Sequence, residues 1–188
     1  MGRFIGFTNY SENQNYLKEK NCILNMNLGA KEKKHYINDN VVLNCLENEK
    51  PFIEQFSFAE YSIIFNGNIY NKKELQELLI QHDVKLEKPS SSELVLNLYI
   101  NFDTEIFEKL NGAFSFVIWD GKEKQVVLVR DHFGIKPIFY TQVNNTLVFA
   151  TEIKTLIQYP SIEKILDSSR YFGAFCNRTC TYSWNNIF

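Results

Sequence analysis

The amino-acid sequence predicts an α+β sandwich in which helices pack on antiparallel sheet. Short apolar runs typical of strands come first, two segments with helical spacing follow, and a series of closely spaced strands comes last. Strands and helices that are grouped, rather than alternating one by one, favour antiparallel sheets covered by helices over a parallel sheet. The 188 residues are 45% hydrophobic, which is enough for one domain with a sizeable core, or for one domain and an incomplete second.

The first clear strand is "FIGF" at residues 4–7, which we interpret as a core strand. The stretch "YSIIFNGNIYN", which begins at Tyr61, holds two apolar pieces separated by Asn66 and Gly67. An Asn-Gly pair accepts positive φ angles and is the strongest short signal for a hairpin. The sequence therefore predicts a turn at Asn66 and Gly67.

Two helices are predicted after this hairpin. Leucines at helical spacing predict a helix with Asn71 as its N-cap and with Glu74 three residues later in a capping-box arrangement. A second helix is predicted over residues 90–102, with Ser90 or Ser91 as its N-cap.

A strand meander is predicted after the helices. Its apolar runs cover residues 113–120, 124–131, 138–143 and 146–151. A short helix follows and ends before Pro160, because the residue before a proline is disfavoured in the helical region.

Composition excludes several classes of function. Lys and Arg number 20 and Asp and Glu number 22, so the sequence does not resemble the basic sequences that are typical of nucleic-acid binders. No apolar run approaches the roughly 20 residues of a membrane-spanning helix, and we expect no membrane partner. The four cysteines are too sparse for a disulfide scaffold, so we expect a reducing, cytoplasmic location and no metal site.

Four segments carry a family resemblance. "FNGNIYNKKEL" is similar to Asn-Gly-Glu-Ile-Tyr-Asn, "LNGAFSFVIWD" to Leu-Asn-Gly-Met-Phe-Ala-Phe, "VRDHFGIKPIFY" to Arg-Asp-Arg-Phe-Gly-Ile-Lys-Pro-Leu-Tyr-Tyr, and "FATEIKTL" to Phe-Ala-Ser-Glu-Ile-Lys-Ala-Leu. These motifs belong to the class II glutamine amidotransferase domain of asparagine synthetases, which is of the N-terminal nucleophile (Ntn) type. The resemblance implies a four-layer αββα sandwich over residues 1–160. It implies that residues 161–188 begin the connection to a C-terminal synthetase domain.

The same resemblance implies a reaction for intact members of the family. A cysteine exposed by removal of the initiator methionine attacks the side-chain amide of glutamine, its own α-amine acts as the base, and ammonia passes to an ATP-using domain. Aligning "MGRFIGF" with the family's Met-Cys-Gly-Phe-Val-Gly-Phe places Gly2 at the nucleophile. Glycine has no side chain, so no thioester can form there.

The other catalytic positions implied by the resemblance are also altered. Asn66 and Gly67 match the oxyanion hole, but without a nucleophile we interpret them mainly as a turn. Asn68 replaces a glutamate, and Ser91 replaces the aspartate that lies near the substrate ammonium group. Residues 4–129 contain no arginine that could bind the substrate carboxylate in a bidentate manner. The resemblance therefore indicates a degenerate active site.

Residues that determine the fold persist beside this degenerate site. We expect Arg130 and Asp131 to pair, and Gly134 and Pro137 to set a turn. A fold can persist after the chemistry of its site has been lost.

The sequence thus favours a glutaminase-inactive N-terminal domain of an ATP-dependent amide-forming enzyme. Lasso-peptide macrolactam synthetases and β-lactam synthetase are similar in lacking the cysteine, so we expect this domain to support a synthetase of that kind. No cofactor is expected in this domain, with ATP and Mg²⁺ in the C-terminal domain. Expected partners are that domain, a peptide substrate or a second copy. Two alternatives remain: an asparagine synthetase domain that uses free ammonia, and a stand-alone non-catalytic binding module.

Overall fold

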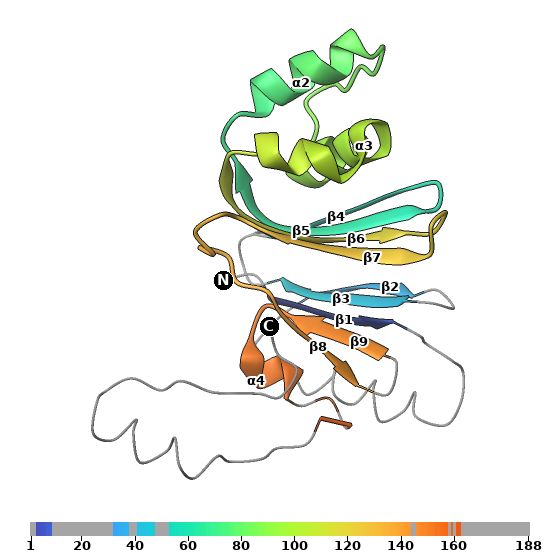
Figure 1. Ribbon diagram of the computed structural model, residues 1–188, viewed down its shortest axis with the longest axis vertical. Coiled ribbons are helices and arrows are strands. Elements are labelled where there is room, and N and C mark those ends of the chain that lie inside the picture. The colour runs from blue at the N-terminus through green and yellow to red at the C-terminus, as the bar shows by residue number, and fades with distance from the viewer. Residues whose placement is uncertain are drawn as a thin grey trace, which may run out of the picture.

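Two antiparallel sheets stack face to face, and helices cover their outer faces (Figure 1). The layers follow the order helix, sheet, sheet, helix, which confirms the predicted four-layer αββα sandwich of the α+β class. This computed structural model describes residues 3–8, 32–37, 41–47, 53–143, 146–157, 159, 161 and 162.

The five-stranded sheet has the strand order β2-β3-β1-β9-β8. Its strands are β1 (Arg3–Thr8), β2 (Glu32–Ile37), β3 (Val41–Glu47), β8 (Phe139–Val143) and β9 (Thr146–Ala150). β1 is central and contains "FIGF", so this predicted core strand is confirmed. In the register of this sheet, Ile5 lies opposite Asn44 on one side and Ala150 on the other.

The four-stranded sheet has the order β4-β5-β6-β7. Its strands are β4 (Ile53–Phe58), β5 (Tyr61–Ile69), β6 (Gly112–Asp120) and β7 (Gln125–Arg130). Side chains alternate between the two faces of a strand. On β6, Phe116 and Ile118 pack under the helices, whereas Val117 and Trp119 pack between the sheets. Both faces of this sheet are therefore buried.

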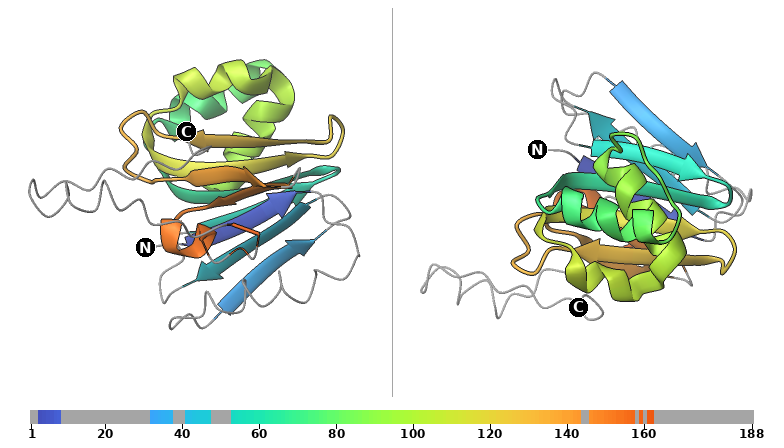
Figure 2. Two further views of the ribbon diagram at one scale, coloured as in Figure 1. Left: turned by 60° about the horizontal axis from the view of Figure 1, so that its bottom comes forward. Right: turned by 90° about the horizontal axis from the view of Figure 1, so that it is seen from above.

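Two helices cover the outer face of the four-stranded sheet, as the view from above in Figure 2 shows. They are α2 (Lys72–Gln81) and α3 (Ser91–Phe102), and a 3₁₀ segment η1 (Asp103–Lys109) leads from α3 toward β6. The short helix α4 (Ile153–Leu156) follows β9 and packs against the other sheet.

The two helix starts differ in how they are capped. The Ser90 hydroxyl accepts a hydrogen bond from the Glu93 N–H at 3.1 Å, which confirms Ser90 as the N-cap of α3. Asn71 precedes α2, but its side chain does not cap the helix. Its amide N–H groups donate to the Lys109 carbonyl at 2.9 Å and to the Glu74 carboxylate at 3.1 Å, and its oxygen accepts from the Asn111 N–H at 3.0 Å rather than from a helix N–H. The predicted capping box is therefore wrong, because the contacts from the loop before β6 take the side chain.

The predicted turn at Asn66 and Gly67 is also wrong. Both residues lie inside β5, a strand of 9 residues that pairs with β4 on one side and β6 on the other. The turn before β5 lies instead at Ala59 and Glu60, where Ala59 has a φ of 52°. Pairing with two neighbouring strands overrides the local turn preference of Asn-Gly.

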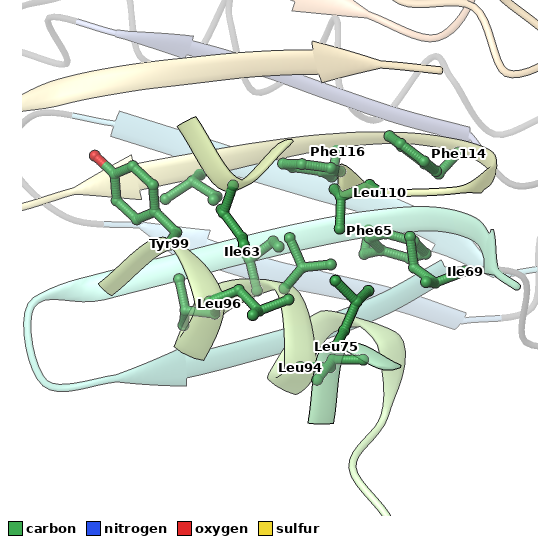
Figure 3. Close-up of a cluster of buried hydrophobic side chains, with 14 of the residues drawn as sticks. Ile63, Phe65, Ile69, Leu75, Leu94, Leu96, Tyr99, Leu110, Phe114 and Phe116 are labelled. Carbon is green, nitrogen blue, oxygen red and sulfur yellow. The ribbon is translucent and has the colours of Figure 1, made fainter. Parts of the chain in front are cut away.

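Two apolar layers hold the sandwich together. One lies between α2, α3 and the four-stranded sheet, where Phe65, Phe114 and Phe116 form stacked and tilted ring contacts (Figure 3). The other lies between the two sheets and includes Phe4, Leu43, Ile64, Val117 and Phe149. Each layer fixes one face of β5 and β6, the strands that carry the candidate site.

Candidate functional site

The candidate site residues lie toward one end of the sandwich. β5 and β7 finish at this end and β6 and β8 begin there, so the connection from β7 to β8 crosses between the sheets at this point (Figure 1). β1 also begins here, because Ile5 is level with Ala150, which in turn is level with Phe139 at the start of β8. We call this region the site end.

Asn66 is fully buried on β5, where it pairs in register with Ile53 and Ser115. Its neighbour Ile64 packs between the sheets, whereas Phe65 packs under the helices. Because residues two apart share a face, the Asn66 side chain points into the space between the two sheets.

Gly67 has a φ of +129°, a conformation that other residues rarely adopt. A Cβ at this position would collide with the carbonyl oxygen of Ala113 on β6. The sheet itself therefore requires glycine at position 67, whatever chemistry the neighbouring side chains perform.

Asn68 and Ser91 occupy the two positions where charge is expected in the family. Asn68 is exposed on β5 and carries a neutral amide. Ser91 is the first residue of α3 and is fully buried, and its hydroxyl has no hydrogen-bond partner among the described residues. The structure therefore does not join Ser91 to Asn66 by a hydrogen bond.

A carboxylate from β4 contacts the N-terminus of α3. Glu54 accepts a hydrogen bond from the Ser92 N–H at 2.8 Å. Together with the Ser90 cap, this contact satisfies two of the free N–H groups at the start of the helix. Glu54 therefore binds α3 to the edge of the sheet.

The interpretation of the sequence missed Ser115. It lies on β6 directly opposite Asn66, it is fully buried, and its hydroxyl has no partner among the described residues. The family motif has alanine at this position, which is the one sequence signal that distinguishes it. A serine hydroxyl becomes a nucleophile only with an adjacent base. Within the part of the chain that the structure describes, neither Ser115 nor Ser91 has such a base as a hydrogen-bond partner.

The start of β1 holds a further charge. The Arg3 side chain lies 3.8 Å (Nε to Oε1) from the Glu152 carboxylate, at the entrance to α4. The Phe4 N–H donates to the Thr151 hydroxyl at 3.1 Å, which holds β1 to the same segment. Gly2, the predicted nucleophile position, lies outside the described residues, and its role stays a prediction.

Asp131 organises the connection between β7 and β8. Its carboxylate accepts hydrogen bonds from the N–H groups of Phe114, Phe133, Ile135 and Lys136, at 3.0 to 3.3 Å. Burial raises the pKa of this carboxyl group, but the four donors together outweigh burial and hold the pKa below its usual value.

The expected pairing of Arg130 with Asp131 is not the contact that forms. The Asp131 carboxylate is satisfied by backbone donors, and the Arg130 side chain lies exposed beside Gly134. Gly134 has a φ of +64°, which confirms that it sets the turn in this connection.

Metal and membrane features can be stated for the described part of the chain. Within it, no group of three or more His, Cys, Asp or Glu side chains could hold a metal ion. None of its helices is long and apolar enough to cross a membrane.

Comparison with known proteins identifies what the chain is similar to. A family described as "Glutamine amidotransferase domain" matches residues 39–187. Asparagine synthetase [glutamine-hydrolyzing] 3 of Bacillus subtilis is 35% identical over 141 residues, which cover 73% of this chain and 23% of that protein. Asparagine synthetase [glutamine-hydrolyzing] 2 of the same organism is 38% identical over 119 residues, which cover 63% of this chain and 15% of that protein. The chain thus spans a quarter or less of these relatives.

The fold is also found in solved structures. The glutamine phosphoribosylpyrophosphate amidotransferase from B. subtilis superposes with a TM-score of 0.59 at 14% identity, over 85% of this chain and 43% of that one. A second structure, of the allosteric regulatory enzyme of purine biosynthesis, superposes with a TM-score of 0.56 at 16% identity. At this identity the likeness shows the fold alone, and it supports the α+β sandwich.

Proposed function

The chain belongs to the family of class II glutamine amidotransferase domains, and we propose that it is a member without glutaminase activity that supports an ATP-dependent, amide-forming domain. The observation that carries this proposal is Gly2, which stands where the family has its nucleophilic cysteine. A hydrogen atom in place of a thiol removes the covalent step of the reaction.

The other candidate positions support this proposal. Free glutamine carries an ammonium group and a carboxylate, and enzymes bind such groups through charged hydrogen bonds. Asn68 and Ser91 offer no charge at the positions that the family resemblance assigns to carboxylates. Gly67 persists for a reason that is independent of catalysis, since the sheet has no room for a side chain there. Asn66 and Gly67 are then remnants of an oxyanion hole.

The proposed partner is a synthetase domain that activates a carboxylate with ATP and Mg²⁺. Residues 1–160 form the amidotransferase-like domain, and residues 161–188 begin the connection. An internal amine as the attacking group, as in a macrolactam-forming synthetase, makes the release of ammonia unnecessary. The loss of glutaminase residues is consistent with that kind of acceptor. This domain has no cofactor of its own in the proposal.

The first test is glutamate release by the purified protein supplied with glutamine, ATP and Mg²⁺. We expect no release above the rate without protein. We expect the same from Gly2→Cys, because the partners for the substrate charges stay absent. Release at an enzyme-like rate that Asn66→Ala abolishes would contradict the proposal.

A second candidate function follows from the names of the relatives, both of which are asparagine synthetases. The whole protein would then form asparagine from free ammonia. This candidate predicts asparagine formation with aspartate, ATP and ammonium chloride, and none with glutamine. If ammonium chloride does not support asparagine formation, the first proposal is favoured, in which the amide-forming enzyme uses an internal amine.

A further inference from the structure

The site end carries large apolar side chains that are exposed to solvent. Phe133 is 91% exposed, Tyr70 is 67% exposed and Ile135 is 56% exposed. Tyr70 directly follows β5, and Phe133 and Ile135 lie in the connection from β7 to β8. We call these three residues the apolar rim.

The connection that bears Phe133 and Ile135 is held firmly. Both residues donate their backbone N–H groups to the buried carboxylate of Asp131, at 3.1 and 3.0 Å. The Gly134 N–H between them donates to the Asp131 carbonyl at 3.0 Å. The backbone is therefore fixed in a conformation that presents the two side chains to solvent.

Tyr70 is anchored in a similar way. Its N–H donates to the Asn111 carbonyl at 2.7 Å, at the start of β6. The same strand start is bound to Asp131, since the Asp131 N–H donates to the Phe114 carbonyl at 2.8 Å. Short backbone contacts to β6 thus place the rim residues at a single end of the sheet.

The composition of this connection is not explained by the fold alone. The family motif has Phe-Gly-Ile-Lys-Pro, and this chain has the same residues from Phe133 to Pro137. The same chain departs from the family motifs at Gly2, Asn68 and Ser91. An exposed phenylalanine gains nothing from the core, whereas burial against a partner stabilises by about 1.5–3 kcal/mol.

We propose that the apolar rim is the surface on which the synthetase domain docks. This inference rests on the proposed function, which supplies that domain as the occupant. The relatives support the choice, because the matched region is only 23% and 15% of their lengths, so in them this domain is joined to a much longer chain. The complementary surface is an apolar socket with an acidic border, since the exposed Arg130 guanidinium flanks the rim.

A second copy of this chain is a poorer occupant of the rim. In a two-fold dimer the same patch meets itself. Such an interface brings two copies of the Arg130 guanidinium toward one another and supplies no new carboxylate from the rim itself. An acidic border on a different domain has no such repulsion.

Photo-crosslinking tests this docking surface in the full natural protein, made in cells together with its synthetase. Phe133 is replaced with p-benzoylphenylalanine, and crosslinked peptides are identified by mass spectrometry. Phe58 receives the same replacement as a control, because it is 57% exposed but is the last residue of β4, next to the β4–β5 turn and away from the site end. We expect crosslinks from position 133 to synthetase peptides and none from position 58. Crosslinks to a second copy, equal crosslinks from both positions, or none from position 133 would overturn the proposal.

A second measurement separates this inference from the proposed function. Phe133→Ser is expected to lower ATP-dependent amide formation by the full protein at least tenfold, while Phe58→Ser leaves it unchanged. Glutamate release is measured on the same preparations. A protein that releases glutamate and still crosslinks to the synthetase through position 133 would contradict the proposed lack of glutaminase activity but would support the docking surface. If no glutamate is released and both variants form amide at equal rates, only the proposed docking surface would be contradicted.

Discussion

The carboxylate of Asp131 holds the backbone of the connection between the two sheets. It accepts four backbone hydrogen bonds from a buried position. In Asp131→Asn, an NH₂ group replaces one oxygen and faces N–H donors that it cannot satisfy. We expect a loss of at least about 2 kcal/mol in the free energy of unfolding, measured by urea denaturation with an unchanged slope.

The exposed Asp83 offers a matched control for this substitution. Asp83→Asn makes the same chemical change at the surface, and we expect it to alter the free energy of unfolding by no more than about 0.5 kcal/mol. Equal effects of the two substitutions would show that the hydrogen bonds of Asp131 do not stabilise the connection.

The stability contributed by Asp131 depends on pH in a definite direction. Its pKa is lower in the folded state than in the unfolded state, where it is about 3.9. The carboxylate therefore stabilises the fold fully above that unfolded pKa, and this contribution is lost as the pH falls through the folded pKa. We expect the difference in unfolding free energy between the natural protein and Asp131→Asn to be constant from pH 5 to 7, where the carboxylate is ionised, and to shrink below about pH 4. A difference that grows as the pH falls would contradict this assignment.

Gly67 is the residue at which fold and lost chemistry can be separated. Gly67→Ala places a Cβ against the Ala113 carbonyl at a positive φ angle, so we expect a loss of at least about 2 kcal/mol in unfolding free energy. The neighbouring Asn68 is exposed, and we expect Asn68→Ala to stay within about 0.5 kcal/mol. Thermal unfolding of the two variants checks this, and a Gly67→Ala variant of natural stability would refute the structural role.

At the scale of elements, the N-terminus of α3 has a side-chain cap, whereas the N-terminus of α2 has none. Ser90→Ala removes the acceptor for the Glu93 N–H and should cost about 1 kcal/mol, whereas Ser90→Gly should cost only a few tenths. Urea denaturation of the two variants gives the comparison. If glycine is as costly as alanine, the cap hydrogen bond is not the main contribution of Ser90.

A second contact joins α3 to the four-stranded sheet near the C-terminal end of the helix. The Tyr99 hydroxyl donates to the Asp120 carboxylate at 2.7 Å and accepts from the Gln125 amide at 3.3 Å. Burial and the bond to Asp120 raise the pKa of Tyr99 above its usual value, so the phenol keeps its proton well into the alkaline range. α3 is thus bound at its start through Glu54 and near its end through Tyr99.

Elements whose signals are local were predicted from the sequence, and those that depend on distant partners were not. The α3 helix follows from leucine spacing and an adjacent serine. The prediction of a turn at Asn66 was wrong because β5 pairs with β6, which lies more than 40 residues further along the chain. The Asn71 cap was wrong for the same reason, since its side chain is taken by Lys109 and Asn111.

The candidate site divides in the same way. The substitutions at Gly2, Asn68 and Ser91 can be read from motifs, because each motif fixes a position along the chain. The position of the Ser115 hydroxyl opposite Asn66 depends on the register between β5 and β6, which no single segment encodes. The exposure of Phe133 likewise depends on the backbone donors that gather on Asp131.

At the scale of the whole molecule, the layer between the sheets makes the sandwich one cooperative unit. Phe149 of β9 is fully buried in this layer, where its cluster includes Val117 and Trp119 of the opposite sheet. Phe149→Ala should therefore cost about 3–5 kcal/mol in unfolding free energy, whereas Phe58→Ala, at the exposed end of β4, should cost far less. This comparison requires only urea denaturation of the two variants.

Cooperativity itself can be measured through Trp119, in a Trp184→Phe background in which it is the sole tryptophan. Trp119 lies in the layer between the sheets and is 4% exposed, so its fluorescence reports the loss of that layer. Far-ultraviolet circular dichroism reports the strands and helices together. Because β5 and β6 are buried on both faces, neither apolar layer can open without exposing the strands of the other, and we expect the two probes to give coincident urea transitions. Phe149→Ala should shift both transitions equally. A fluorescence transition at lower urea than the circular dichroism transition would mean that the sheets separate before the helices leave the four-stranded sheet.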